Sequence, residues 1–426
     1  MTVLEQTPRS DTVDLDYWAR HAVPILASLL KSAESYSPAD QDAHLRLLTD
    51  HVLPNLGPRP SAAHTGSLLT QSGSPFQPSL NLSAGKPIVR YCWELLGADG
   101  GSDTDPFAVD AAQKILFSLS KTLGFSTQWS DELLSAFAPT PEEAQDVRER
   151  LPKWLANFTS AEAGVPSLKR LPFSFVAFEL KGSKTSTKAY FNPKIKEVAT
   201  GVPANDMVWR VLRDLKPALN VESIDIVAKF LSERDVPSTI ELVGIDCVDD
   251  ARLSDARVKI YVHTRSNSFN TVRDYVTLGG RLQDERALKG LASLREIWHL
   301  LLQEPEGIPD DDYNKPLNDG SMLCQSLYFS FEMRPGAASP EVKTYLPTWN
   351  YVRSDEETVR NYEEVFRKCG QAWGHEGRYK KAFEGAFGPV NHNRKKPVHL
   401  DASFLYSEKN GIYQTLYFSA PLVAEE

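Results

Sequence analysis

Basic and phenolic side chains alternate with apolar ones in several short stretches of this chain. In "RVKIYVHT" (257–264), Arg257, Lys259 and Tyr261 occupy every second position, and Val258 and Ile260 lie between them. Alternation with a period of two is typical of a β-strand, so one face of this strand carries two cations and a phenol. Such a face can bind an anion through its cations and hold a positive charge against its aromatic ring.

The same alternation recurs in other stretches that read as strands. Lys188 shares a face with Tyr190, and Lys343 shares a face with Tyr345. Polar alternating faces also carry Arg90, Tyr328, Ser330, Glu332, Tyr413 and Tyr417. A single strand of this kind fits an ordinary sheet with one wetted face. A surface strand has no need of matched tyrosines, however, so the recurrence favours one shared polar interior.

The order of the predicted elements explains how these faces converge. We expect five hairpins, formed by residues 76–83 with 88–96, 172–180 with 187–193, 238–246 with 256–264, 324–334 with 342–348, and 399–407 with 412–420. We expect helices at 14–35, 38–53, 105–123, 129–137, 140–158, 204–216, 220–233, 269–277, 283–303 and 354–374. Repeated hairpins with helices between them predict an α+β fold. We expect a ten-stranded antiparallel β-barrel surrounded by helices and built from five αββα units. The barrel would form one domain over residues 1–426, and its lumen would be too wide for side chains to fill easily.

Five cations in one lumen would repel one another unless an anion is bound. The cations concerned are Arg90, Lys188, Arg257, Lys259 and Lys343. A diphosphate suits them, since each charge-assisted contact contributes about 1.5–3 kcal/mol before desolvation costs. Neighbouring tyrosine rings attract a carbocation by about 0.5–2 kcal/mol. Together these groups would stabilise a leaving diphosphate, shield an allyl cation and exclude water, as ionisation of an allylic diphosphate requires.

Composition narrows the function classes. The chain has 426 residues and a formal net charge of −9, which argues against a nucleic-acid-binding surface. The N-terminus has acidic residues where a signal peptide would be apolar, and no apolar run is long enough to span a membrane, so we expect a cytoplasmic protein with no membrane partner. Four scattered cysteines indicate reduced core residues. The histidine spacing predicts no metal site, and "PDDDYN" (309–314) is interpreted as a solvated loop.

Motifs along nearly the whole chain resemble those of the fungal aromatic prenyltransferases of the dimethylallyl tryptophan synthase type. The matching stretches are "YWARHAVPIL", "VLPNLGPRP", "SGSPFQPSLNLS", "VRYCWELLG", "KAYFNP", "RVKIYVHT", "FSFEMRPG", "VKTYLP" and "YQTLYFS". Each motif is weak alone, but together they are specific. The resemblance implies an αββα barrel that transfers a prenyl group from its diphosphate to an electron-rich aromatic carbon. The expected prenyl group is dimethylallyl, and the expected context is secondary metabolism such as indole alkaloid biosynthesis. It also implies that no cofactor and no divalent metal is required.

The resemblance assigns roles to individual positions. It implies that the diphosphate is bound by Arg90, Lys188, Arg257, Lys259 and Lys343. It implies that the prenyl cation is shielded by Tyr190, Tyr261, Tyr345, Tyr413 and Tyr417. We further expect Tyr328 and Ser330 to set the depth available to the prenyl chain, with Phe175 in the prenyl and acceptor pocket.

Two departures from the family pattern concern the aromatic acceptor. Tryptophan-directed members carry a glutamate where this chain has Gln77, and a lysine where it has Phe175. Gln77 can accept a hydrogen bond but cannot remove a proton. The acceptor is therefore expected to be a modified indole, a phenol or another polycyclic aromatic instead of free tryptophan. Gln77 and Glu332 are the candidate catalytic residues, and the base stays open between Glu332, Glu179 and His399.

Two other classes of function stay open at this stage. The barrel could act on the prenyl diphosphate alone, as a terpene cyclase or a hydrolase. It could also be a non-catalytic carrier of small molecules. A homodimer is one arrangement that the sequence leaves open.

Overall fold

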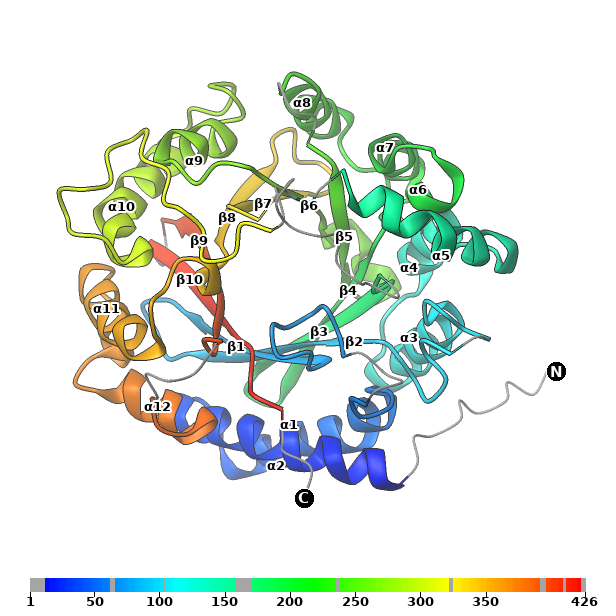
Figure 1. The fold of residues 1–426 in the computed structure, drawn as a ribbon, viewed down its shortest axis with the longest axis horizontal. Coiled ribbons are helices and arrows are strands. Elements are labelled where there is room, and N and C mark those ends of the chain that lie inside the picture. Colours follow the sequence, from blue (N-terminus) through cyan, green and yellow to red (C-terminus); the bar gives the residue numbers. More distant parts are fainter. Residues whose placement is uncertain are drawn as a thin grey trace.

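Ten antiparallel strands close into a barrel at the centre of the molecule. In this computed structural model, which describes residues 12–61, 66–102, 104–157, 159, 171–234, 238–321, 325–390, 396–408 and 411–422, the strand order is β1-β10-β9-β8-β7-β6-β5-β4-β3-β2. Every strand pairs with its neighbours in the chain, and β1 pairs with β10 to close the cylinder. Figure 1 looks into this barrel and shows the helices around it. The expected helix-wrapped barrel is confirmed.

The strands form five hairpins, as predicted. Their bounds are β1 (Phe76–Leu82), β2 (Ile88–Glu94), β3 (Ser174–Lys181), β4 (Lys184–Phe191), β5 (Ile240–Cys247), β6 (Val258–His263), β7 (Tyr328–Met333), β8 (Glu341–Leu346), β9 (His399–Ser407) and β10 (Gly411–Phe418). Because the strands alternate in direction, the five hairpin turns all lie at one end of the barrel. We call this end the turn end, and the opposite end, where β1, β3, β5, β7 and β9 begin, the acceptor end.

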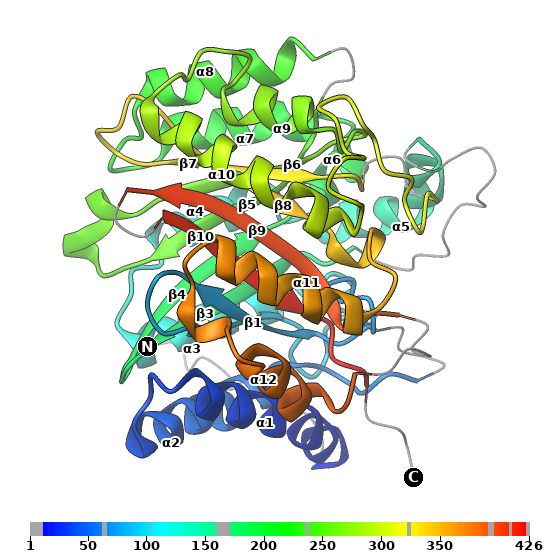
Figure 2. The same cartoon turned by 90° about the vertical axis from the view of Figure 1, so that its left-hand side faces the viewer.

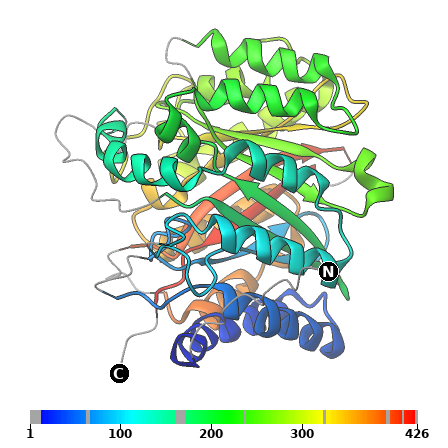
Figure 3. The ribbon, with the colours of Figure 1, turned by 90° about the vertical axis from the view of Figure 1, so that its right-hand side faces the viewer.

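Helices cover the outside of the barrel on all sides. Their bounds are α1 (Thr12–Ala33), α2 (Pro38–Leu47), α3 (Val109–Leu123), α4 (Gln128–Phe137), α5 (Pro141–Leu155), α6 (Lys194–Thr200), α7 (Ala204–Asp214), α8 (Val221–Ser232), α9 (Phe269–Val276), α10 (Glu285–Leu302), α11 (Asp355–Lys368) and α12 (Arg378–Phe387). Short π or 3-10 turns are η1 (Leu48–Val52), η2 (Leu53–Asn55), η3 (Asp250–Asp255), η4 (Thr348–Asn350) and η5 (Ala372–Gly374). Figure 2 shows α10, α11 and α12 over β9 and β10, and Figure 3 shows the cyan and green helices over the opposite side. No helix within these described residues is both long and apolar enough to cross a membrane.

The hydrophobic core lies between the outer face of the barrel and this helical ring. Phe329 and Phe331 of β7 are fully buried and point outward. Phe329 stacks on Tyr275 of α9 with ring centroids 4.4 Å apart, and Phe331 contacts Phe230 of α8. Burying a side chain of this size stabilises the fold by about 1.5–3 kcal/mol. The alternating strands therefore place their apolar face on the helices, which leaves the polar face for the lumen.

Several predicted helices differ from those in the structure. The expected helix at 354–374 ends as α11 at Lys368, because Gly370 takes a left-handed backbone conformation (φ 66°) that breaks the helix. The sequence reading missed α12 and the short α6. The start of the fourth hairpin at 324, with Cys324, and part of the last hairpin turn lie outside the described residues. The helix predicted from residue 38 does begin there, as α2, with a capping box between Ser37 and Asp40.

Candidate active site

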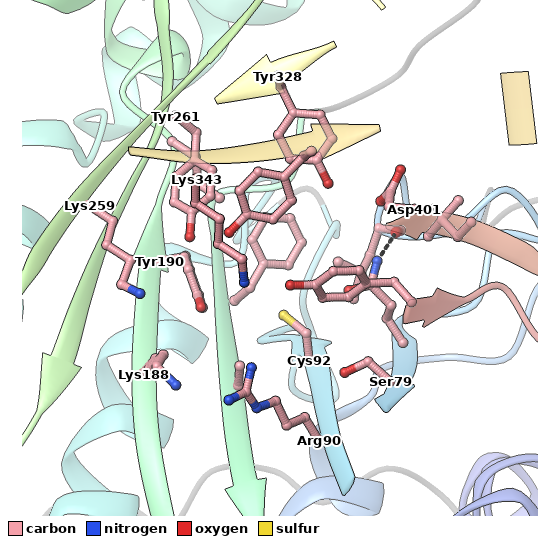
Figure 4. Close-up of a pocket in the computed structure, with 18 of the residues that line it drawn as sticks. Ser79, Arg90, Cys92, Lys188, Tyr190, Lys259, Tyr261, Tyr328, Lys343 and Asp401 are labelled. Atoms are coloured by element: carbon pink, nitrogen blue, oxygen red, sulfur yellow. Dashed lines mark hydrogen bonds between the residues drawn. The ribbon is translucent and has the colours of Figure 1, made fainter. Parts of the chain in front are cut away.

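The barrel encloses a cavity of about 620 Å³ lined by side chains from all ten strands. All five predicted cations line it, as do all five predicted tyrosines of the cation shield. Gln77, Phe175, Tyr328 and Glu332 also line the cavity. Figure 4 shows Arg90, Lys188, Lys259, Lys343, Tyr190, Tyr261 and Tyr328 directed into the same space from different strands.

Three strands present a lysine and a tyrosine in the same order. The pairs are Lys188 with Tyr190 on β4, Lys259 with Tyr261 on β6, and Lys343 with Tyr345 on β8. Each of these strands leaves its hairpin connection before it reaches the lysine, so the lysine lies nearer the turn end. Two residues of strand advance by about 6.6 Å. The lumen therefore has a cationic layer toward the turn end and a tyrosine layer beyond it.

Carboxylates on neighbouring strands pair with the cations. Glu179 of β3 lies 2.6 Å from Arg90 and 3.4 Å from Lys188. Although burial opposes ionisation, these cations lower the pKa of Glu179 to about 2. Glu179 is therefore a carboxylate at neutral pH and neutralises part of the cationic layer.

Arg257 and Lys259 are paired in the same way. Arg257 lies 2.6 Å from Asp246 and 3.0 Å from Glu332, and Lys259 lies 2.7 Å from Glu332. Against the opposing effect of burial, Lys259 and Arg257 lower the pKa of Glu332 to about 2. We expected the five cations to need a bound anion to coexist, and this was wrong in part, because the protein supplies three carboxylates of its own. Five cations facing three carboxylates leave an excess of two positive charges in this layer.

Lys343 is the cation of this layer with the least charge compensation. Its ammonium is buried and lies 5.3 Å and 5.2 Å from the ring centres of Tyr345 and Tyr413. Burial and then the charge of Arg90 lower its pKa well below the ordinary value. Burial likewise lowers the pKa of Lys188 to about 8. Both ammonium groups would gain from a multiply charged anion placed between them.

The tyrosine layer forms a continuous aromatic wall. Tyr261 lies 6.1 Å from Tyr190 and 5.8 Å from Tyr345 between ring centroids, and Tyr345 lies 6.3 Å from Tyr417. Gly244 of β5 makes room for one of these rings, since a Cβ atom at this position would lie 2.8 Å from the Tyr190 ring. The wall can surround a small cation with ring faces and edges.

The acceptor end has a different lining. Gln77 lies at the start of β1, and its Nε2 donates a hydrogen bond to the Leu69 carbonyl at 3.2 Å. Apolar side chains form much of the remaining lining at this end: Leu68, Leu69, Phe175, Leu242, Pro347, Trp349 and Leu400. In the described part of the chain, every lysine and arginine that lines the cavity belongs to the cationic layer. A large apolar molecule therefore fits this end better than a charged one does.

The sequence reading missed three titratable groups at the acceptor end, namely Glu241, His263 and Asp401. Glu241 pairs with Lys194 at 2.6 Å and with His263 at 2.5 Å. Asp401 of β9 lines the cavity and accepts a hydrogen bond from the Tyr328 hydroxyl. His263 lies on the same predicted face as Tyr261, so alternation alone could have found it. Asp401 stands in no repeated pattern.

Two residues considered earlier lie away from the cavity surface. Ser330 is fully buried between Tyr261 and Lys343 on the neighbouring strands and does not contribute to the lining. His399 is held by Asp355 and Tyr379, each at 2.7 Å, and packs on Phe383 of α12 outside the barrel. The register between β9 and β10 shifts beside His399, so its side chain does not follow Asp401 into the lumen. Among the described residues, no group of three or more histidine, cysteine or acidic side chains could hold a metal ion.

A closed ten-stranded barrel with cationic and tyrosine layers in its lumen defines the class of αββα-barrel prenyltransferases. Residues 14–382 match the family model described as tryptophan dimethylallyltransferase. The chain is 69% identical to an indole diterpene prenyltransferase (terF) of Tolypocladium album over 95% of this chain and 93% of that protein. It is 54% identical to an indole diterpene prenyltransferase (ltmF) of Epichloe festucae var. lolii, over 98% and 95% of the two chains. The chain belongs to the tryptophan dimethylallyltransferase family.

A solved structure supports the same conclusion about the fold. The crystal structure of AnaPT from Neosartorya fischeri superimposes with a TM-score of 0.81 at 26% identity, covering 98% of this chain and 96% of that one. The protein is therefore an aromatic prenyltransferase, an enzyme that transfers a prenyl group from its diphosphate to an aromatic acceptor. The cyclase, hydrolase and carrier alternatives are not favoured.

Proposed function

We propose that this enzyme transfers a dimethylallyl group from dimethylallyl diphosphate to a ring carbon of an indole diterpene. The observation that carries the proposal is the order of the lumen, with a cationic layer, a tyrosine layer and an apolar acceptor end following one another. The names of the two relatives described above support the indole diterpene as acceptor.

The proposed donor site is the cationic layer. Arg90, Lys188, Arg257, Lys259 and Lys343 bind the diphosphate, while Glu179, Asp246 and Glu332 offset part of their charge in the free site. When the allylic C–O bond breaks, its electron pair leaves with the diphosphate, whose new charge is stabilised by these fixed cations. Preorganised charges of this kind cost little reorganisation during the reaction.

The proposed cation shield is the tyrosine layer. Tyr190, Tyr261, Tyr345 and Tyr417 surround the dimethylallyl cation and keep water from it. Tyr413, whose hydroxyl accepts a hydrogen bond from Arg90 at 2.6 Å, closes the shield on the side of the cationic layer. Tyr328 stacks on Tyr345 with ring centroids 4.5 Å apart, and with Phe175 it limits the depth of the prenyl pocket. A π-electron pair of the acceptor ring then forms the new carbon–carbon bond.

The acceptor end supports a polycyclic indole better than free tryptophan. A tryptophan carboxylate would find no lysine or arginine in the described lining of this end. The apolar side chains from Leu68 to Leu400 instead match a hydrocarbon skeleton, and the Gln77 amide oxygen can accept an indole N–H hydrogen bond. All of these residues come from one chain, so the proposed site needs no second copy.

Product analysis tests the proposal. The purified enzyme would be incubated in chelator with dimethylallyl, geranyl or farnesyl diphosphate, each with an indole diterpene, tryptophan or a simple phenol. By mass spectrometry, we expect the dimethylallyl adduct of the indole diterpene as the main product, with little conversion of tryptophan. Efficient prenylation of free tryptophan, or consumption of donor without any aromatic product, would refute the proposed acceptor.

A further inference from the structure

Five acidic side chains line the cavity in the described part of the chain, and four of them are paired with lysine or arginine. The pairs are Glu179 with Arg90 and Lys188, Glu241 with Lys194, Glu332 with Lys259 and Arg257, and Glu341 with Arg286. Asp401 is the fifth, and it makes no ion pair with a lysine or arginine of the described residues. Its only hydrogen-bond partner identified among them is the Tyr328 hydroxyl.

Asp401 also lies at a different level of the lumen from Glu179 and Glu332. Asp401 is the third residue of β9, which begins at the acceptor end, whereas Glu179 is the sixth residue of β3 and Glu332 the fifth residue of β7, both nearer the turn end. Figure 4 shows Asp401 across the cavity from Lys188 and Lys259, with the Tyr328 ring beside it. Asp401 therefore borders the acceptor end, where the aromatic ring must lie when its carbon attacks a cation held by the tyrosines.

The electrostatic surroundings separate Asp401 from the other carboxylates. Burial raises its pKa to about 7, and the Tyr328 hydrogen bond and the charge of His263 oppose this rise. The other titratable groups that interact with it are Tyr417 on β10 and Tyr362 on α11, both of them phenols. Glu179 and Glu332, with pKa values of about 2, are weak bases. A general base works best when its pKa is near the working pH.

We propose that Asp401 is the catalytic base that accepts the proton lost by the aromatic acceptor. Once the acceptor carbon has bonded to the allyl cation, its C–H bond breaks and the electron pair of that bond restores the aromatic ring. The proton passes to a carboxylate oxygen of Asp401 and returns to solvent after the product leaves. No further reactant is needed. The inference rests on aromatic prenyl transfer, and on the proposed indole diterpene only for the choice of assay substrate.

Asp401→Asn is the first test, because an amide keeps the size of the side chain but cannot accept the proton. We expect kcat to fall by about 10²- to 10⁴-fold, the usual contribution of a general base. Binding of the unreactive dimethylallyl thiolodiphosphate, measured by calorimetry, should be unchanged. With an acceptor deuterated on its indole ring, the variant should show a larger primary isotope effect than the wild type, since proton loss becomes rate-limiting. A purely structural role would not raise this isotope effect.

The pH profile provides a second and independent test. Asp401 must be ionised to act, so kcat should rise with pH through an apparent pKa near 7 in the wild type. Tyr328→Phe removes the hydrogen bond that lowers the pKa of Asp401, so the rise of kcat with pH should move to higher pH. Asp401→Glu should restore part of the lost kcat. The matched control is Asp225→Asn on the exposed face of α8, which should keep both kcat and the pH profile.

The outcomes distinguish the inference from the proposed function. The role of Asp401 would be overturned if the Asp401→Asn variant kept the kcat, the isotope effect and the low-pH side of the kcat–pH profile of the wild type. If Asp401→Asn does not fold, an unmoved low-pH side of this profile in Tyr328→Phe would overturn it instead. A wild-type enzyme that leaves every indole diterpene unmodified but prenylates another aromatic would refute the acceptor alone, and the Asp401 tests would then be made with that other aromatic.

Discussion

Lys259 and Glu332 face each other across β6 and β7, with Lys259 Nζ 2.7 Å from Glu332 Oε1. Both side chains are buried, at 8% and 4% exposure. The contact holds the ammonium in the lumen before any substrate arrives. A diphosphate entering the cationic layer would therefore meet a charge already in position.

Lys259→Ala should weaken donor binding without unfolding the protein. Loss of one charge-assisted contact worth about 1.5–3 kcal/mol corresponds to a tenfold to hundredfold rise in Kd for dimethylallyl thiolodiphosphate. Calorimetry measures the Kd, and circular dichroism checks the fold. The control is Lys289→Ala, which removes an exposed lysine paired with Glu285 on α10. Equal donor affinity in the two variants would contradict the proposed clamp.

Donor binding should depend on pH through the buried lysines. Burial lowers the pKa of Lys188 to about 8 and that of Lys343 well below its ordinary value. A bound diphosphate favours the ammonium forms and raises both pKa values, so binding takes up protons. Affinity should therefore fall as the pH rises through 8. Calorimetric titrations at pH 8 in buffers of different ionisation enthalpy would measure the proton uptake. A heat of binding that does not depend on the buffer would count against this uptake.

Gly244→Ala should disturb catalysis more than binding. The added Cβ would lie 2.8 Å from the Tyr190 ring, which must then move into the lumen. A shift of this kind in a reacting site can cost about a hundredfold in rate. We expect a lower kcat with a nearly unchanged Kd for the thiolodiphosphate. Gly307→Ala is the matched control, since nothing lies within 4 Å of the added atom there. A wild-type kcat in Gly244→Ala would show that the position of Tyr190 is unimportant.

Chelators should leave the reaction rate undiminished. In the proposed site, five protein cations do the work that a magnesium ion would otherwise do for a leaving diphosphate. Initial rates measured with and without excess EDTA, after dialysis against the chelator, test this. A rate that collapses in EDTA and recovers with magnesium would mean that the protein cations are insufficient.

Much of the lumen could be predicted from the sequence, because alternation along a strand is a local property. The spacing of Lys188 and Tyr190, repeated at Lys259 and Lys343, indicates that one face of these strands is polar. The helices predicted between the hairpins indicate that the other face is covered. Barrel closure followed from five hairpins in succession. The register of β1 with β10, which completes the cylinder, depends on residues more than 300 positions apart and left no local signal.

The countercharges and the base were harder to predict. Glu179 and Asp246 face their cations only after β3 pairs with β2 and β5 with β6, so their roles depend on tertiary register. Asp401 is a single carboxylate in "HLDASFLYS", and the register shift near His399 changes which of its neighbours point inward. Its raised pKa arises from burial in the finished barrel, which no spacing in the sequence expresses.

The claim that supports everything else is that basic side chains from separate hairpins bind one diphosphate inside the barrel. A crystal structure of the enzyme soaked with inorganic diphosphate in chelator tests it most directly. We predict a diphosphate among the Nζ atoms of Lys188, Lys259 and Lys343, on the turn-end side of the tyrosine layer. A lumen without diphosphate, or a diphosphate bound only at the outer surface, would contradict this account.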